Sequence, residues 1–241
     1  MSQPFNPYAA PSAASGDVSI TAGDGQPMPW TPGDILSAAW NRFNTTWLAL
    51  VGACIVTMFL GNLVSWAAQI AIALGHLEKS AVGHVLYGGG LFLSVCASSF
   101  FMVGLWRLFL DAARNRPLQF GTLFLGGDRW LPLLALQFLM LPLMLVAYLL
   151  FIVPGVILAL GLGFAQFYVI DANMGPIEAM RASWEVTKGQ RTQLFALGLL
   201  SFAVFVAGLA LCCVGALAAW PLTCLAWAIA FTRISGRNPV S

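Results

Sequence analysis

Residues 130–170 read WLPLLALQFLMLPLMLVAYLLFIVPGVILALGLGFAQFYVI, and no charged side chain interrupts them. A bilayer-spanning helix needs about 20 consecutive apolar residues, so this stretch is long enough for two. Pro154 and Gly155 lie near its middle and predict a tight, uncharged turn. Pro132 and Pro142 predict kinks in the first of the two helices. The stretch is therefore typical of a hairpin of two membrane-spanning helices.

The rest of the chain has the composition of a membrane protein. Hydrophobic residues make up 59% of its 241 residues, charged residues make up 8%, and the mean hydropathy is +0.83. A soluble domain needs a polar surface, whereas the outer surface of a membrane protein is apolar. We therefore predict an all-α, polytopic membrane helix bundle. Its six spans cover about residues 47–74, 84–110, 130–153, 156–170, 192–213 and 216–231.

The basic residues are distributed unevenly between the predicted loops. Ten of the eleven lie in segments that alternate spans place on one side of the membrane: Arg42, Arg107, Arg114, Arg116, Arg129, Arg181, Lys188, Arg191, Arg233 and Arg237. Lys79 falls on the other side. The positive-inside rule then places both termini in the cytoplasm. Abundant Ala, Gly and Pro favour a bacterial source, so we expect a multi-pass protein of the bacterial cytoplasmic (inner) membrane. The net charge of +2 is too small to indicate nucleic-acid binding.

A tail and three amphipathic segments complete the predicted organisation. Residues 1–31 are rich in Pro, Ala, Ser and Gly without apolar periodicity, which predicts a disordered cytoplasmic tail and no signal peptide. Segments 32–46, 117–127 and 175–190 are predicted to be interfacial helices, because their apolar residues share one helical face. Thr31, Pro32 and Asp34 form the helix-start pattern of the first. Residues 32–241 are thus interpreted as three repeats of an interfacial helix followed by a hairpin.

A stripe of uncharged polar residues runs along the first predicted span. Asn62, Ser65 and Gln69 are spaced at i, i+3 and i+7, so they share one helical face. Hydrogen bonding between helices is the favoured interpretation, and a path for a solute is the alternative. Polar residues of the next three spans are further candidates to face the same centre of the bundle as this stripe. They are Ser94, Ser98, Ser99, Gln137 and Gln166. None of these residues is charged, which argues against an ion-coupled transporter.

The basic loops supply candidate contacts to lipid phosphates. These candidates are Arg107, Arg114, Arg116, Arg181, Lys188 and Arg191. Arg107 and Asp111 are four residues apart at the end of the second span, so an ion pair within one helix or a snorkelling arginine is the favoured role for Arg107. Asp171 begins a short loop with Ala172 and Asn173, which favours a role in a turn.

The sequence carries no recognisable catalytic, cofactor or metal motif. We find no phosphate-binding loop, dinucleotide glycine motif, nucleophile elbow or zinc-protease helix, so we expect a protein that is not an enzyme and has no cofactor. His76, Glu78 and His84 lie close in sequence, but their spacing matches no common metal site. The five cysteines lie inside predicted spans and are interpreted as small buried residues: Cys54, Cys96, Cys212, Cys213 and Cys224.

One local signature resembles a known group of proteins. Val153-Pro154-Gly155 is followed by Val169-Ile170-Asp171 and by GPIEAMRASWEVTKGQ at residues 175–190. This pattern resembles bacterial six-helix membrane proteins, among them the uncharacterised YciC-like inner-membrane family and the membrane domain of some glycerophosphodiester phosphodiesterases. The resemblance covers about residues 33–235 and implies the fold and topology. The chain has no room for a phosphodiesterase domain, so that activity is not carried over.

Two functional hypotheses follow from these features. The first is a non-enzymatic membrane scaffold or accessory protein, whose interfacial helices and basic rim bind membrane lipids and whose tail, residues 1–31, recruits a soluble or membrane protein partner. The second is a facilitator or channel for a small solute or lipid, which uses Asn62, Ser65 and Gln69. A core filled by side chains favours the first hypothesis, and a continuous polar cavity favours the second.

Overall fold

The computed structural model describes residues 30–76, 80–210 and 214–236, and the described residues are helical without a β-strand among them. The long helices are α1 (Pro32–Leu74), α2 (Ala81–Ala113), α3 (Trp130–Leu150), α7 (Arg191–Ala210) and α8 (Val214–Ile234). The shorter ones are α4 (Ile152–Leu162), α5 (Ala165–Asp171), α6 (Pro176–Val186) and the 3-10 helices η1 (Phe120–Phe124) and η2 (Gly126–Asp128). Six helical stretches are long and apolar enough to cross a membrane, with α4 and α5 counted as one. The predicted all-α class is confirmed.

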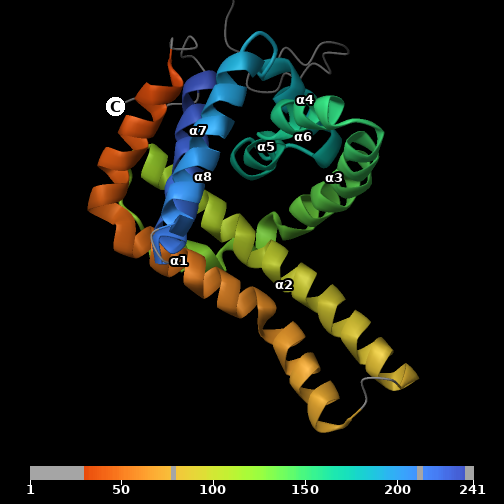
Figure 1. Cartoon of the computed structure of the whole chain (residues 1–241). Helices are drawn as coiled ribbons and strands as arrows, with labels where there is room; N and C mark the ends of the chain where they lie inside the picture. The colour runs from red at the N-terminus through yellow and green to blue at the C-terminus, as the bar shows by residue number, and fades with distance from the viewer. Residues whose placement is uncertain (1–29, 77–79, 211–213, 237–241) are drawn as a thin grey trace, which may run out of the picture.

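Helices α1 and α2 form one hairpin and α7 and α8 form another, and α3 packs against the short α4. Figure 1 shows α1 and α2 side by side (orange and yellow), with a tip that projects away from the other helices. Helix α8 packs against α1, α2 and α7. The most apolar stretch of α8 is 61% buried, whereas the corresponding stretches of α3 and α7 are each 17% buried. Helix α8 is therefore central, and α3 and α7 present most of their apolar surface outward.

Helix α1 begins where the sequence predicts. Thr31 and Asp34 exchange side-chain and backbone hydrogen bonds of 3.2 Å each, and Pro32 occupies the first helical position. The segment predicted as an interfacial helix, 32–46, and the first predicted span form one continuous helix, α1. No Gly or Pro lies between Asp34 and Trp47 to break it, and the hydroxyl groups of Thr45 and Thr46 bond back to the carbonyl oxygen of Arg42.

The segment over 117–127, predicted as one short interfacial helix, forms the two 3-10 helices η1 and η2. This segment lies directly against the backbone of α2. A Cβ atom on Gly104 of α2 would stand 2.5 Å from the Cα of Leu123, and one on Gly126 would collide with the carbonyl oxygen of Phe100. Close backbone packing through glycine, together with the buried side chain of Leu123, holds the segment in place.

The third and fourth spans also differ from the prediction. The turn between them lies at Phe151, whose backbone is extended, and Pro154 and Gly155 belong to the first turn of α4. There the missing N–H of Pro154 removes no intrahelical bond. The predicted span over 156–170 is interrupted, because α4 ends at Leu162 and α5 begins at Ala165. The interfacial helix predicted over 175–190 is the shorter α6, and Val214-Gly215, predicted as a turn, begins α8.

Aromatic side chains fill the centre of the bundle. The rings of Phe167 in α5 and Phe231 in α8 stack with centroids 5.0 Å apart and planes 17° apart. Phe164 and Trp106 complete the contact from the α4–α5 break and from α2. Phe164, Phe167 and Phe231 are fully buried. The core between α2, α5 and α8 is therefore closed by rings.

Candidate functional site

The predicted polar stripe forms its hydrogen bonds within α1. The amide nitrogen of Asn62 donates to the carbonyl oxygen of Met58 at 2.8 Å, and that of Gln69 donates to the hydroxyl oxygen of Ser65 at 3.3 Å. Ser65 is buried against α2, whereas Gln69 is exposed. The three residues therefore do not line one continuous path.

Hydrogen bonds between the spans come from serine residues of α2. Ser94 and Ser98 donate to the carbonyl oxygen of Gly61 at 2.8 and 3.2 Å, and a Cβ atom on Gly61 would stand 2.7 Å from the Ser98 hydroxyl oxygen. Ser99 donates to Gln137 of α3 at 2.9 Å. Gln137 and Gln166 line a separate small cavity between α3, α4 and α5. These side chains serve different helix contacts and do not converge on one centre.

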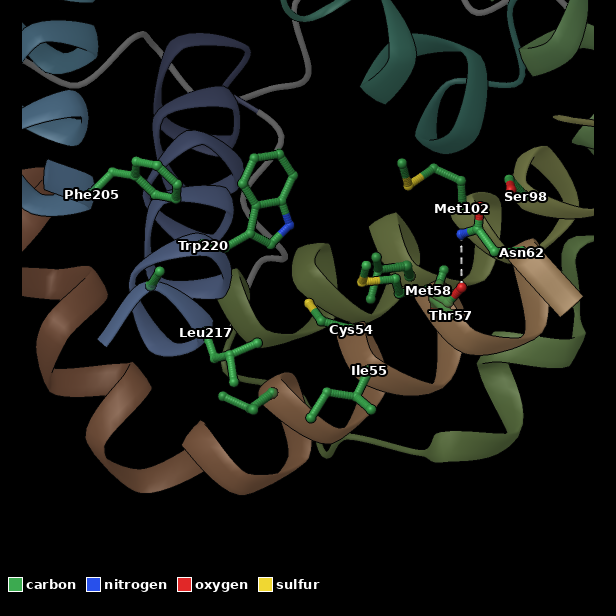
Figure 2. Close-up of a pocket in the computed structure, with 13 residues that line it drawn as sticks. Cys54, Ile55, Thr57, Met58, Asn62, Ser98, Met102, Phe205, Leu217 and Trp220 are labelled. Atoms are coloured by element: carbon green, nitrogen blue, oxygen red, sulfur yellow. Dashed lines mark hydrogen bonds between the residues drawn. The ribbon is translucent and has the colours of Figure 1, made fainter. Parts of the chain in front are cut away.

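A half-open cavity of about 450 Å³ lies between α1, α2, α7 and α8. Figure 2 shows the rings of Phe205 and Trp220 toward one side of it and Asn62 and Ser98 toward the other. Its lining side chains are uncharged and mostly apolar: Val51, Cys54, Ile55, Thr57, Met58, Asn62, Ser98, Met102, Leu105, Phe205, Ala216, Leu217 and Trp220. The hydroxyl of Thr57 is buried and has no hydrogen-bond partner. The cavity thus combines an apolar wall with a few polar atoms.

Arg114 and Asp171 form a bidentate ion pair that joins the end of α2 to the end of α5. The two N–H···O distances are 2.6 and 2.7 Å, and only 10% and 14% of the side chains are exposed. Asp171, predicted as a turn residue, is thus half of a shielded ion pair. Arg114 is engaged within the protein, so it is not a free contact for lipid phosphate.

Arg107 pairs with a different acid from the predicted one. Its guanidinium donates to Asp128 at 2.7 Å and to the carbonyl oxygen of Leu125 at 2.6 Å, whereas Asp111 lies 3.8 Å from Arg116. The predicted pair of Arg107 with Asp111 is wrong, because η2 places Asp128 within closer reach. The hydrogen bond from Arg107 lowers the pKa of Asp128 below its ordinary value.

The end of α2 and the segments around it carry Arg42, Arg114, Arg116 and Arg129, and we call this part of the bundle the basic end. A second cavity lies there, between α1 and the segment after α2. Its volume is about 450 Å³, and it is lined by Arg42, Thr45, Thr46, Trp47, Leu48, Ala49, Arg116, Pro117, Leu118 and Phe120. Arg42 donates to the carbonyl oxygens of Ala112 and Arg116, both at 3.1 Å, which fixes its guanidinium. The side chain of Arg116 is 52% exposed. Arg42 was not among the phosphate contacts predicted from the sequence.

The remaining basic candidates lie on or beside α6. Arg181 is exposed, and Lys188 forms an exposed ion pair with Glu185 at 2.7 Å. The guanidinium of Arg191 lies 3.9 Å from the ring centre of Trp184, a cation–π contact. Arg116, Arg181 and Lys188 are therefore the predicted phosphate contacts whose side chains are most open to a ligand.

Helix α6 also supplies hydrogen bonds to backbone groups at the break between α4 and α5. The Ser183 hydroxyl accepts from the backbone N–H of Phe164 at 3.2 Å and donates to the carbonyl oxygen of Gly161 at 2.8 Å. A Cβ atom on Gly161 would collide with the ring of Trp184. Ser183 and Trp184 belong to the local signature, but periodicity gave them no such role. Ser183 contacts residues that lie 19 or more positions earlier in the chain, and such a contact cannot be seen from the periodicity of the sequence.

Several sequence predictions fall outside the residues that the structure describes. These are Lys79, Glu78, Cys212, Cys213, Arg237 and the tail up to residue 29. Within the described part of the chain, no group of three or more His, Cys, Asp and Glu side chains is placed to hold a metal ion. The ring of His84 contacts the carbonyl oxygen of Ser80 at 2.8 Å.

Comparisons with known proteins point to relatives without an assigned activity. A family model described as a domain of unknown function (DUF7847) matches residues 119–235. The uncharacterised protein Mb2590 of Mycobacterium bovis is 24% identical over 236 residues, covering 89% of this chain and 72% of its own length. The uncharacterised protein Rv2560 of Mycobacterium tuberculosis is 23% identical over the same shares. No solved structure matches significantly. These matches show no link to the YciC-like or phosphodiesterase-associated proteins.

Proposed function

We propose that this chain is a non-enzymatic scaffold or accessory protein of the bacterial inner membrane, with both termini in the cytoplasm and anionic lipid bound at its basic end. The observation that carries the proposal is the gathering of basic side chains by contacts between distant helices. Arg42 of α1 bonds to the end of α2, and Arg114 joins that end to α5. Arg129, beside the start of α3, bonds to the carbonyl oxygen of Asn173.

The charges at this end are unequally neutralised. Asp128 and Asp171 offset Arg107 and Arg114 at 2.6–2.7 Å, whereas Asp111 lies 3.8 Å from Arg116. A phosphate group should therefore bind best in the cavity lined by Arg42 and Arg116, since a guanidinium fork matches phosphate oxygens. Trp47, Leu48 and Phe120 surround it with exposed apolar surface suited to the boundary between lipid head groups and chains.

The start of α1 supports the recruitment of a partner at the same end. Trp30 is 4% exposed, and its indole N–H donates to the side-chain oxygen of Gln190 at 2.8 Å. Gln190 lies between α6 and α7, next to Arg191. The described chain therefore begins beside the junction of α6 and α7. A tail that starts there can bring a soluble protein to the same membrane surface.

Lipid binding to the purified full chain tests the proposal. Native mass spectrometry should detect more bound phosphatidylglycerol than phosphatidylcholine. The combined variant Arg116→Gln, Arg181→Gln and Lys188→Gln should lower that preference about tenfold or more, because each basic group near an anionic surface contributes about 1 kcal/mol. Lys79→Gln is the matched control and should change nothing. Equal binding of the two lipids, or an equal loss in the control, would contradict the proposal.

Two further experiments test orientation and recruitment. A reporter placed at residue 79 should report the far side of the membrane, and a cytoplasmic signal would overturn the orientation.

Crosslinking and affinity purification from native membranes should recover a discrete partner with the full chain and lose it when residues 1–29 are removed. Recovery of the same partner without the tail would contradict the recruitment role.

The facilitator alternative has weaker support. The cavity that Asn62 lines is mostly apolar, and the rings of Phe164, Phe167 and Phe231 fill the neighbouring core. A small polar solute would lose its hydration there without gaining equivalent hydrogen bonds. Flux that falls in an Asn62→Leu variant of the reconstituted chain would favour the facilitator.

A further inference from the structure

We propose that the sulfur atoms of Cys54, Met58 and Met102 form a binding site for one soft monovalent metal ion, Cu(I). These residues are the sulfur-bearing members of the lining of the cavity between α1, α2, α7 and α8. This cavity shares no lining residue with the one at the basic end. The inference therefore goes beyond the proposed lipid binding and does not rest on it.

Helix periodicity brings the first two sulfur ligands together. Cys54 and Met58 are four residues apart in α1, so their side chains lie one turn apart on the same face of the helix. Both side chains line the cavity, and Figure 2 shows their sulfur atoms beside it. A methionine side chain has three rotatable bonds, so the thioether of Met58 can move toward the thiol of Cys54 without a change in the backbone.

The packing of α2 on α1 supplies the third ligand. The Ser98 hydroxyl donates to the carbonyl oxygen of Gly61 at 3.2 Å, which places these two positions opposite each other in the hairpin. Met102 lies about one turn after Ser98 in α2, and Met58 lies about one turn before Gly61 in α1. Because the two helices of a hairpin run in opposite directions, Met102 lies opposite the turn of α1 that carries Met58. Both thioethers therefore border the same space.

The kind of donor atom determines which metal the site prefers. Thiolate and thioether sulfur atoms prefer Cu(I), whereas Mg²⁺ and Ca²⁺ need oxygen ligands and Zn²⁺ takes Cys, His and carboxylate ligands. No histidine or carboxylate lines this cavity. The described residues also contain no group of three or more His, Cys, Asp and Glu side chains placed for a metal, but such groups do not include thioethers. The cavity thus favours an ion that sulfur alone can hold.

Charge balance supports the same choice. The lining is uncharged, and one wall belongs to the part of α1 that is able to cross a membrane, where a net charge is costly. When Cu(I) binds, the thiol of Cys54 releases its proton to water, and the charges of the thiolate and the ion cancel. Met58 and Met102 bind as neutral donors, and no electron is transferred. A divalent ion bound in the same way would keep one uncompensated positive charge.

Titration of the full chain in detergent with Cu(I) tests the proposal. The ion is supplied anaerobically with ascorbate, and a coloured Cu(I) chelator that competes for it reports the affinity and the number of ions bound. Cys212 and Cys213 are first replaced by serine, so that this adjacent pair of thiols cannot contribute. We expect one bound ion, which an excess of Zn²⁺ does not displace. X-ray absorption of the complex should show copper surrounded by sulfur without nitrogen or oxygen ligands.

Variants of the three ligands, made in the same background, define the site. Cys54→Ser should abolish binding, because it removes the thiolate. Met58→Leu and Met102→Leu nearly keep the volume of the side chain and should each weaken binding about tenfold, since each removes one thioether ligand. Cys96→Ser and Met140→Leu are the matched controls, because neither residue lines the cavity, and they should leave binding unchanged. Size-exclusion profiles of all the variants verify the fold.

Several results would overturn the proposal. These are a chain that binds no Cu(I), nitrogen or oxygen ligands in the absorption spectrum, a loss of binding in the controls equal to that in the ligand variants, and binding that survives both methionine variants. The last result would place the ion elsewhere, for example between Cys54 and the thiol of Cys224, which is buried in α8. None of these results bears on anionic lipid at the basic end, which is measured with different residues and a different ligand.

Discussion

The third and fourth of the helical stretches able to cross a membrane are adjacent in sequence and carry no charged residue before Asp171, yet one is peripheral and the other is largely buried. Helix α3 is the more apolar of the two and is 17% buried over its most apolar part, whereas the stretch made of α4 and α5 is 50% buried. Helix α3 contains Pro142 and remains unbroken, whereas the fourth span breaks after Leu162, where there is no proline. Hydropathy therefore does not tell which span is central.

The difference lies in what each span contacts. The backbone groups freed at the α4–α5 break are bonded by Ser183, which is fully buried in α6. Arg114 then holds the end of α5 through Asp171. Much of α3, in contrast, exposes large apolar side chains such as Leu145 and Leu149. A helix can break inside a membrane protein where a neighbour satisfies its backbone, and the neighbour decides the place.

The largest effect is expected at the end of the fourth span. Arg114→Ala removes both charge-assisted hydrogen bonds that join the ends of α2 and α5, so the free energy of unfolding should fall by about 3–5 kcal/mol. Denaturation of the purified chain in mixed detergent, followed by helical circular dichroism, measures this loss. The double variant Arg114→Ala with Asp171→Ala should recover part of it. Lys188→Ala breaks an exposed pair and should cost less than about 1 kcal/mol. Equal losses in the two single variants would break the comparison.

A smaller loss is expected where α4 meets α6. Gly161→Ala places a methyl group against the ring of Trp184, so the helices must separate, at a cost of about 1–3 kcal/mol. Gly52→Ala adds the same group where nothing lies within 4 Å and should be neutral or stabilising. The thermal midpoints of the two variants in detergent compare them directly. A tolerated Gly161→Ala would mean that α6 does not hold the break closely.

Removal of the hydroxyl at the break should cost less again. Ser183→Ala leaves the N–H of Phe164 without its partner, although Thr187 still lies 3.4 Å from the carbonyl oxygen of Gly161. We expect a loss of about 1–2 kcal/mol. Hydrogen exchange at Phe164 and Ala165 should speed up at the same time. Unchanged exchange would show that the break does not depend on Ser183.

The smallest effect is expected in α3. Pro142→Ala restores a backbone donor in a helix that already continues through the proline, so the unfolding free energy should change by less than about 1 kcal/mol. The same detergent denaturation applies. A large change in either direction would show that α3, like the fourth span, depends on a specific internal contact.

Composition and hydropathy were sufficient for the helical class and for six stretches able to cross a membrane. The start of α1 followed from Thr31, Pro32 and Asp34, because capping is local. The Arg114–Asp171 pair was missed, since the two residues are 57 positions apart and spacing rules compare neighbours on one helix. The same limit hid the break beside Ser183 and assigned Arg107 to the wrong acid. The cavities were also beyond reach, because four helices must meet before either the shape or the unpartnered Thr57 can be seen.

The buried Trp30 has a mechanical consequence. Its indole is held by Gln190, 160 positions later in the chain, and α1 continues from it without interruption. A force applied at Trp30 would therefore act on this hydrogen bond and on the packing around the ring. Loss of the contact would expose the indole and release the side chain of Gln190, between α6 and α7, at the same time.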